Sequence, residues 1–218
     1  MLDGLRAWWR GLRHLNQQGY LYIWANVLWA LLSLPIVTAP AAWAGLVRMS
    51  TLAHTTPTAS VSDFWQGFRE NLRQGVALGV LNILIVMVNI SNLQAYREQT
   101  GGLFALLRAI WLLTLAVWFA VQFYLWPIYY QMERPTIRGA LRNAAVMLLL
   151  NPAFTLGLWI GVVLVLLFSL LFFPAWLLLT GGALAAIATG AALDRLEAAG
   201  FSQRQEVFGA GGEDASGI

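Results

Sequence analysis

Four long runs without a charged residue constrain this chain more than any other feature. They cover residues 15–47, 74–96, 109–132 and 143–193. A bilayer core of about 30 Å needs roughly 20 apolar residues of helix, so each run can supply a span, and the last can supply two that meet at Pro174. Charged residues make up only 11% of the chain, whereas soluble domains carry about 25%. The sequence predicts an all-α, polytopic helical bundle in a membrane.

Two segments of the chain repeat one another. Residues 9–28 and 65–84 are identical at seven of twenty positions at an offset of 56, and a fainter third copy includes Arg138 and Asn151. Internal repeats are common in membrane proteins. We therefore expect a single transmembrane domain over residues 1–200, built from three units at about 5–56, 61–131 and 134–195. Each copy has an arginine, a small residue six positions later and an asparagine thirteen positions after the arginine: Arg13, Gly19 and Asn26; Arg69, Gly75 and Asn82; Arg138, Ala144 and Asn151.

Each unit is expected to begin with an amphipathic helix in the membrane interface and to continue as a two-helix hairpin. The six expected spans pair residues 19–34 with 41–55, 75–93 with 103–130, and 144–172 with 175–193. Arginine and tryptophan collect at membrane surfaces, and short cytoplasmic loops collect arginine. We therefore expect both termini in the cytoplasm, because this orientation places nearly all arginines on the cytoplasmic side. Only Arg97 then faces outward, and the side on which Arg108 lies stays open. The expected interfacial anchors are Arg13, Arg69, Arg138, Trp9 and Trp65.

The first hairpin fits the six-span prediction least well. Residues 19–34 rise only about 24 Å as a helix, so their turn would lie below the outer surface. Irregular backbone at that depth must be covered by protein or line a water-filled cavity. Arg48, in the returning helix, must snorkel inward, find a partner or line a cavity. A five-span alternative treats residues 19–47 as one kinked helix and leaves the first three arginines outside.

Asn26, Asn82 and Asn151 form a candidate polar cluster together with Arg48. Each asparagine lies seven positions after the small residue of its unit, so the two share one helix face. One interpretation is that these amides hydrogen-bond between helices and only hold the bundle together. The other is that they converge around a pseudo-threefold axis and line a site for a neutral, hydroxyl-rich ligand.

Several classes of function lack the residues that they need. The predicted spans contain no Asp or Glu, which removes the usual carboxylate for proton or sodium coupling. The chain has no cysteine, and no metal-binding motif surrounds His14 or His54. Without lysine there is no phosphate-binding loop. We expect no catalytic residue, cofactor, metal or nucleic-acid partner, and a disordered cytoplasmic tail over 201–218, since this segment is rich in glycine and acidic residues.

Three features resemble the YesL-like family of small bacterial membrane proteins. They are Asn26 with Trp29, the stretch PIVTAPAAWAGL at 35–46, and DFWQGFRENLRQG at 63–75; the resemblance runs roughly from Gly19 to Arg195. That family has no established activity, but its genes often accompany sugar-uptake systems. The resemblance implies a multi-pass protein of the bacterial cytoplasmic membrane that assists a carbohydrate ABC transporter and contacts its permease. The alternative is a passive channel or facilitator for a neutral solute; the oligomeric state stays open.

Overall fold

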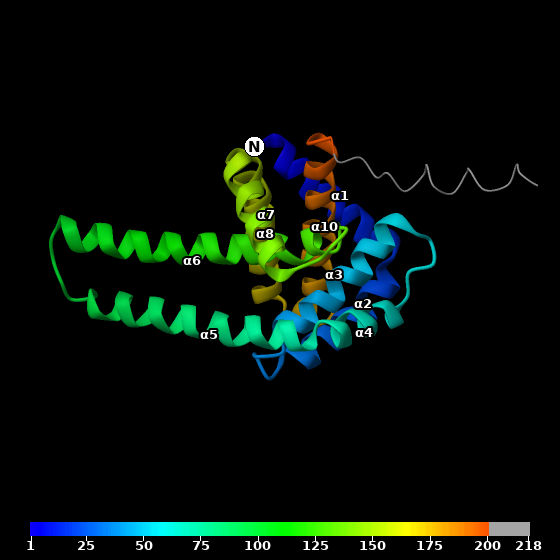
Figure 1. The fold of residues 1–218 in the computed structure, drawn as a ribbon, viewed down its shortest axis with the longest axis horizontal. Helices are drawn as coiled ribbons and strands as arrows, with labels where there is room; N and C mark the ends of the chain where they lie inside the picture. The colour runs from blue at the N-terminus through cyan, green and yellow to red at the C-terminus, as the bar shows by residue number, and fades with distance from the viewer. Residues whose placement is uncertain (201–218) are drawn as a thin grey trace, which may run out of the picture.

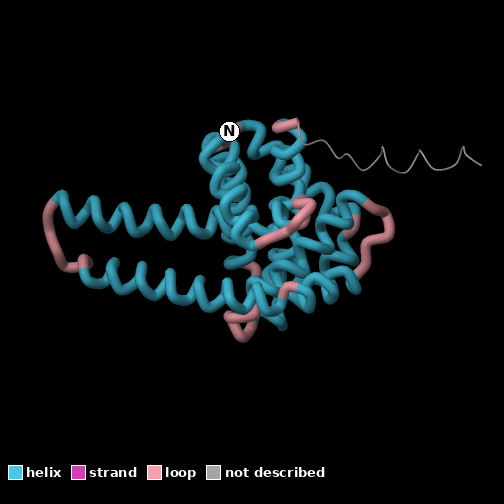
Figure 2. Tube along the Cα trace, in the orientation of Figure 1, coloured by secondary structure: helices cyan, strands magenta, loops and turns pink. Residues whose placement is uncertain are grey.

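The computed structural model describes residues 1–200, and these contain helices and no strand. The predicted all-α fold is confirmed, whereas the predicted disordered tail, 201–218, lies outside the described residues. Figures 1 and 2 show the arrangement. The elements are α1 (Leu2–Gln17), α2 (Gly19–Ser33), α3 (Ala39–Thr55), α4 (Val61–Glu70), α5 (Leu72–Ala95), α6 (Gly102–Tyr129), α7 (Ile137–Leu150), α8 (Pro152–Leu171), the short α9 (Phe173–Ala175), the π-helix η1 (Trp176–Thr180) and α10 (Gly181–Ala198).

Four helical segments of the described chain are long and apolar enough to cross a membrane. They are α5, α6, α8 and the continuous segment Phe173–Ala198, which joins α9, η1 and α10. The protein is therefore a multi-pass membrane protein by length and composition. With 15 and 17 residues, α2 and α3 rise only about 22 and 26 Å, which is less than the hydrocarbon core. Of the six predicted spans, those at α2 and α3 are therefore the two whose helices are too short to cross the core unaided.

Three helices meet at the centre of the molecule. Helices α3 and α10 and the C-terminal part of α6 pack against one another, and they bury Leu46, Leu125, Trp126 and Ile187 completely. The remaining helices pack around this centre. Helix α1 lies across α8 and α10, α4 lies along α3, and α7 packs against α6.

Local signals begin the shorter helices. The carboxylate of Asp63 accepts a hydrogen bond from the backbone N–H of Ser60 at 2.8 Å, which forms a capping box at the start of α4. The Thr136 hydroxyl accepts a hydrogen bond from the Gly139 N–H at the start of α7. Helix α8 begins at Pro152, a residue that suits the first turn because its missing N–H would have no partner there.

Two predictions about helix boundaries change. The expected continuous span 144–172 is wrong, because the chain breaks at Asn151 and a proline at 152 cannot continue the α7 hydrogen-bond ladder. The five-span alternative also fails over 19–47, where α2 and α3 are separate helices that pack against each other. The turn between them is covered by α5, since a side chain at Gly79 would collide with the Val37 carbonyl. This cover is what irregular backbone in a membrane protein requires.

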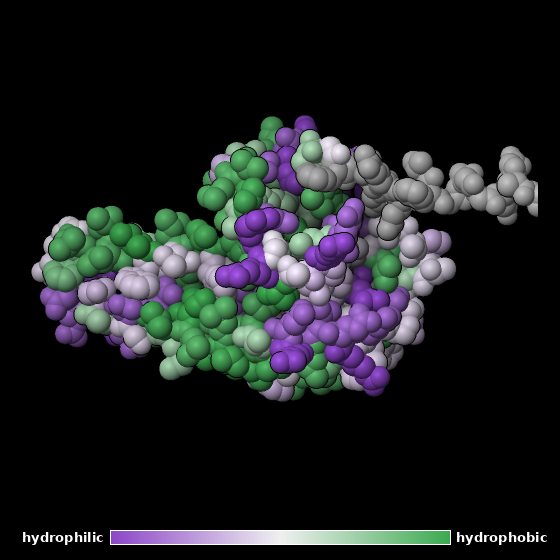
Figure 3. Space-filling view, viewed as in Figure 1, coloured by the Kyte–Doolittle hydropathy of each residue, from purple (hydrophilic) through white to green (hydrophobic). Residues whose placement is uncertain are grey.

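The distal halves of α5 and α6 form an arm that reaches away from the centre. We call residues 80–119 the α5–α6 arm; Figure 1 shows it running crosswise to α7, α8 and α10. Its outward residues are apolar and exposed, among them Leu84, Met87, Leu106 and Leu113. Figure 3 shows this apolar surface along the arm, with polar groups gathered toward its outer end.

Candidate functional site

Asn26 is fully buried and all of its amide is in use. Its Nδ2 donates to the carbonyls of Trp176 and Leu177 at 3.1 and 2.5 Å, and its Oδ1 accepts from the Gly182 N–H at 2.8 Å. These partners belong to η1 and the start of α10. A π-helix departs from the regular α-helical hydrogen-bond pattern. The amide of Asn26 therefore forms hydrogen bonds with an irregular segment of the last long apolar helix and stabilises it. The contacts favour the interpretation of Asn26 as a residue that holds helices together.

Asn82 bonds within the α5–α6 pair. Its Oδ1 accepts hydrogen bonds from Trp118 Nε1 at 2.9 Å and from Gln122 Nε2 at 3.1 Å, both on α6. Asn151 forms the break between α7 and α8, and its Nδ2 donates only to the Met147 carbonyl in the preceding turn. No hydrogen bond among the described residues joins two of the three asparagines.

The three asparagines therefore do not hold equivalent places. Asn26 and Asn82 lie inside α2 and α5, whereas Asn151 lies between two helices. The amides of Asn26 and Asn82 form hydrogen bonds with other helices, whereas the amide of Asn151 donates to a carbonyl in the last turn of α7. The structure thus gives no shared set of amide groups pointing at a common ligand.

Arg48 finds a partner on the amphipathic helix α4. Its Nη1 lies 2.5 Å from Glu70 Oε2, and the Arg48 side chain is only 24% exposed. Beside it, the Tyr130 hydroxyl donates to the Ala44 carbonyl at 3.0 Å and accepts a hydrogen bond from Asn71 Nδ2. The sequence indicated that Arg48 must find a partner, snorkel or line a cavity. It did not identify Glu70, because that contact depends on how α4 folds back along α3.

The two histidines, 40 positions apart in sequence, stack on each other. The rings of His14 and His54 lie 3.6 Å apart at 15°. His14 Nε2 donates to the Ala53 carbonyl, and His14 Nδ1 lies within hydrogen-bond distance of the Tyr22 hydroxyl, at 3.3 Å. Burial lowers the pKa of the His14 ring below its usual value. The described residues contain no cluster of three or more metal ligands around this pair.

The expected interfacial anchors lie on exposed helix faces. Trp9 and Trp65 are 57% and 38% exposed, and the Arg69 guanidinium stacks over the Trp65 ring at 4.9 Å. Arg13 and Arg138 are also exposed. These positions agree with an interfacial role, because tryptophan and arginine both prefer the headgroup region.

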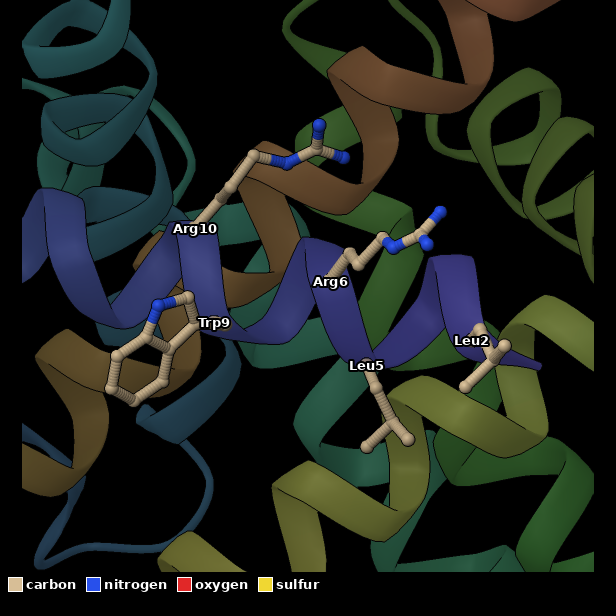
Figure 4. A pocket seen from close by; sticks show the side chains of 5 residues that line it. All are labelled: Leu2, Leu5, Arg6, Trp9 and Arg10. Carbon is tan, nitrogen blue, oxygen red and sulfur yellow. The ribbon is translucent and has the colours of Figure 1, made fainter.

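Two open hollows lie on or beside α1. The first, of about 450 Å³, is lined by Leu2, Leu5, Arg6, Trp9 and Arg10, which Figure 4 shows as sticks. The second, of about 270 Å³, lies where α1 meets the end of α10, and its lining includes Arg10, Asp194 and Arg195. Neither hollow is lined by an asparagine of the predicted cluster or by Arg48. The sequence marked Trp9 as an anchor but gave no signal for a hollow.

The fold and these contacts define a multi-pass helical membrane protein with short amphipathic helices, α1 and α4, packed on its core. Residues 22–93, which cover α2 to α5 except for their ends, match the family DUF624, described as a protein of unknown function. The three features that resemble the YesL-like family all lie in this segment. No curated protein and no solved structure matches the chain.

Proposed function

We propose that this protein is an accessory subunit of the membrane that docks on the permease of a carbohydrate uptake system. The observation that carries this proposal is the α5–α6 arm. Its two helices are apolar on nearly every side, yet the rest of the chain covers little of them. In the most apolar 18-residue stretch of each helix, only 17% of the residues of α5 and 11% of those of α6 are buried. A surface of this kind must be covered by lipid or by other membrane helices.

The arm is built as a stiff hairpin rather than as two loose helices. Near its base Asn82 accepts hydrogen bonds from Trp118 and Gln122. At its outer turn Arg108 Nη1 donates to the Tyr96 and Gln99 carbonyls. Carbonyls at the end of a helix have no partner within it, so Arg108 stabilises the turn. Hydrogen bonds at both ends of the arm thus fix the pairing of α5 with α6. The paired helices present a preformed apolar surface.

Six membrane passages in three units, with both termini in the bacterial cytoplasm, are part of the same proposal. The helix contacts support the three units. The first helix of each expected unit packs on the last helix of the preceding one, as α4 does on α3, α7 on α6 and, closing the ring, α1 on α10. The last helices, α3, α6 and α10, meet at the centre. The short α2 and α3 would then cross a locally thinned bilayer.

Passive facilitation of a neutral solute stays a prediction without a supporting contact. It was motivated by a convergence of three amides, but Asn26 and Asn82 each have partners on another helix. Docking requires only the exposed arm. We assign no catalytic residue, cofactor or metal in this proposal.

Photo-crosslinking in intact bacterial membranes tests the docking proposal. A photoreactive amino acid is placed at Leu84 or Leu113 on the arm, and at Leu164 or Leu167 on α8 as a matched control; all four leucines are about half exposed or more. We expect the arm positions to yield an adduct with the permease subunit of a carbohydrate transporter, and the α8 positions to yield lipid adducts only. The proposal fails if arm adducts contain only lipid or a second copy of this chain, or if both sets capture the same proteins.

A further inference from the structure

Helix α1 presents three different faces to its surroundings. Its inner face consists of the small residues Gly4, Ala7 and Gly11, which are buried. The outward part of the helix divides into an apolar side and a basic side. The apolar side contains Leu2, Leu5 and Trp9, and the basic side contains Arg6, Arg10 and Arg13. In Figure 4 the side chains of Arg6 and Arg10 extend from one side of α1, while those of Leu5 and Trp9 extend from the other.

The packing of α1 fixes this orientation. A side chain at Gly4 would collide with the Phe154 carbonyl of α8, and one at Gly11 would lie 2.7 Å from the Ile187 Cα of α10. Rotation of α1 about its axis would replace these glycines by larger residues, for which there is no room. Leu2 and Trp9 consequently remain 68% and 57% exposed. Large apolar side chains fixed at an exposed surface of a membrane protein indicate contact with lipid.

The arginines of α1 keep donors free for a ligand. Arg6 Nη1 pairs with Asp3 at 3.0 Å, and Arg10 Nη2 pairs with Asp194. The side chains of Arg6 and Asp3 are both more than 60% exposed, and exposed ion pairs are weak. In the second pair Arg10 is 62% exposed and Asp194 is 24% exposed. A guanidinium has five N–H donors, so each pair leaves most of them available. Arg13 has no ion pair among the described residues.

We propose that the hollow on α1 is a binding site for one anionic phospholipid. The phosphate and headgroup lie against Arg6 and Arg10, which can bind a phosphate with several parallel N–H donors. One acyl chain runs along Leu2, Leu5 and Trp9. A small soluble phosphate would leave these three apolar side chains uncovered, so the occupant is a lipid. The site lies on the exposed surface of α1, away from the α5–α6 arm, and does not depend on the docking proposal.

Native mass spectrometry of the delipidated full-length protein in a neutral detergent tests this site. Dioleoyl phosphatidylglycerol and dioleoyl phosphatidylcholine are titrated separately, and we expect one tightly bound phosphatidylglycerol with clearly weaker phosphatidylcholine binding. Arg6→Gln with Arg10→Gln should weaken the first phosphatidylglycerol about thirty-fold, because each arginine near an anionic lipid surface contributes about a fivefold step. Trp9→Ser should weaken both lipids.

Two control variants distinguish the loss of this site from a general loss of positive charge and from the loss of the ion pair of Arg10. Arg97→Gln with Arg134→Gln removes the same charge at exposed arginines outside α1 and should leave lipid binding unchanged. Asp194→Asn removes the ion pair of Arg10 but keeps the arginine, and it should retain or strengthen phosphatidylglycerol binding. Equal binding of the two lipids, equal loss in both double variants, or full displacement of phosphatidylglycerol by inorganic phosphate would overturn the proposal.

Discussion

Replacement of Asn26 by leucine should destabilise the protein more than the same change at Asn82 or Asn151. Asn26 makes three interhelical hydrogen bonds and Asn82 makes two, whereas Asn151 makes one, to the last turn of α7. Side-chain hydrogen bonds in membrane proteins contribute about 0.6 kcal/mol each on average. The lost bonds alone therefore amount to about 2 kcal/mol for Asn26→Leu, about 1 kcal/mol for Asn82→Leu and about 0.6 kcal/mol or less for Asn151→Leu.

The loss at Asn26 can exceed this value, because its partners are backbone groups in a buried place. Each buried polar group that stays without a partner costs about 1–3 kcal/mol. The Gly182 N–H faces Asn26 Oδ1, and a leucine at position 26 offers it nothing. We therefore expect a loss between about 2 and 5 kcal/mol in the free energy of unfolding for Asn26→Leu.

The measurement is reversible unfolding in mixed micelles with increasing dodecyl sulfate, followed by circular dichroism. Asn92→Leu is the matched control, since Asn92 donates only to the Val88 carbonyl of its own helix, as Asn151 does within α7. The reasoning predicts that Asn151→Leu and Asn92→Leu behave alike. Equal losses at Asn26, Asn82 and Asn151 would refute it and would favour a shared cluster of the three amides.

Two further changes probe other contacts. Gly67→Leu should cost about 1–3 kcal/mol by overpacking, because even a Cβ there would lie 2.9 Å from the Arg48 side chain and 3.0 Å from the Gly45 Cα; thermal unfolding in detergent measures the loss. Glu70→Gln should cost about 1 kcal/mol or less, with a difference from the wild type that shrinks at high salt.

The helical membrane class could be predicted from the sequence because its cause is local. A run such as residues 74–96 has no charge, and hydrocarbon tolerates such a run only as a helix or a closed barrel. Helix α5 covers nearly this range. The break at Asn151 was harder to place, because a proline in a membrane helix produces either a kink or a complete interruption, and packing of the neighbouring helices decides between them.

The contacts of the candidate sites could not be predicted, because they depend on how α1 and α4 fold back onto the core. The stacking of His14 on His54 joins α1 to α3, and the pairing of Arg48 with Glu70 joins α3 to α4. Both contacts require close helix approach, which Gly67 permits at the second. At the repeat offset of 56, Gly11 aligns with Gly67, and each of these glycines lies at a close helix contact. The alignment does not indicate which helix each one touches.

The crosswise course of the α5–α6 arm limits how the protein can lie in a bilayer. Figure 1 shows α8 and α10 running in a different direction from α5 and α6, so no single membrane normal is parallel to both pairs. Helix α8, with 20 residues, rises roughly 30 Å and can cross the hydrocarbon core only when it stands nearly upright. Helix α6, with 28 residues, rises roughly 42 Å, but it runs crosswise to α8 and is therefore strongly inclined when α8 stands upright. A strongly inclined arm carries its apolar surface sideways from the core, to the place where we propose that a neighbouring membrane protein binds it.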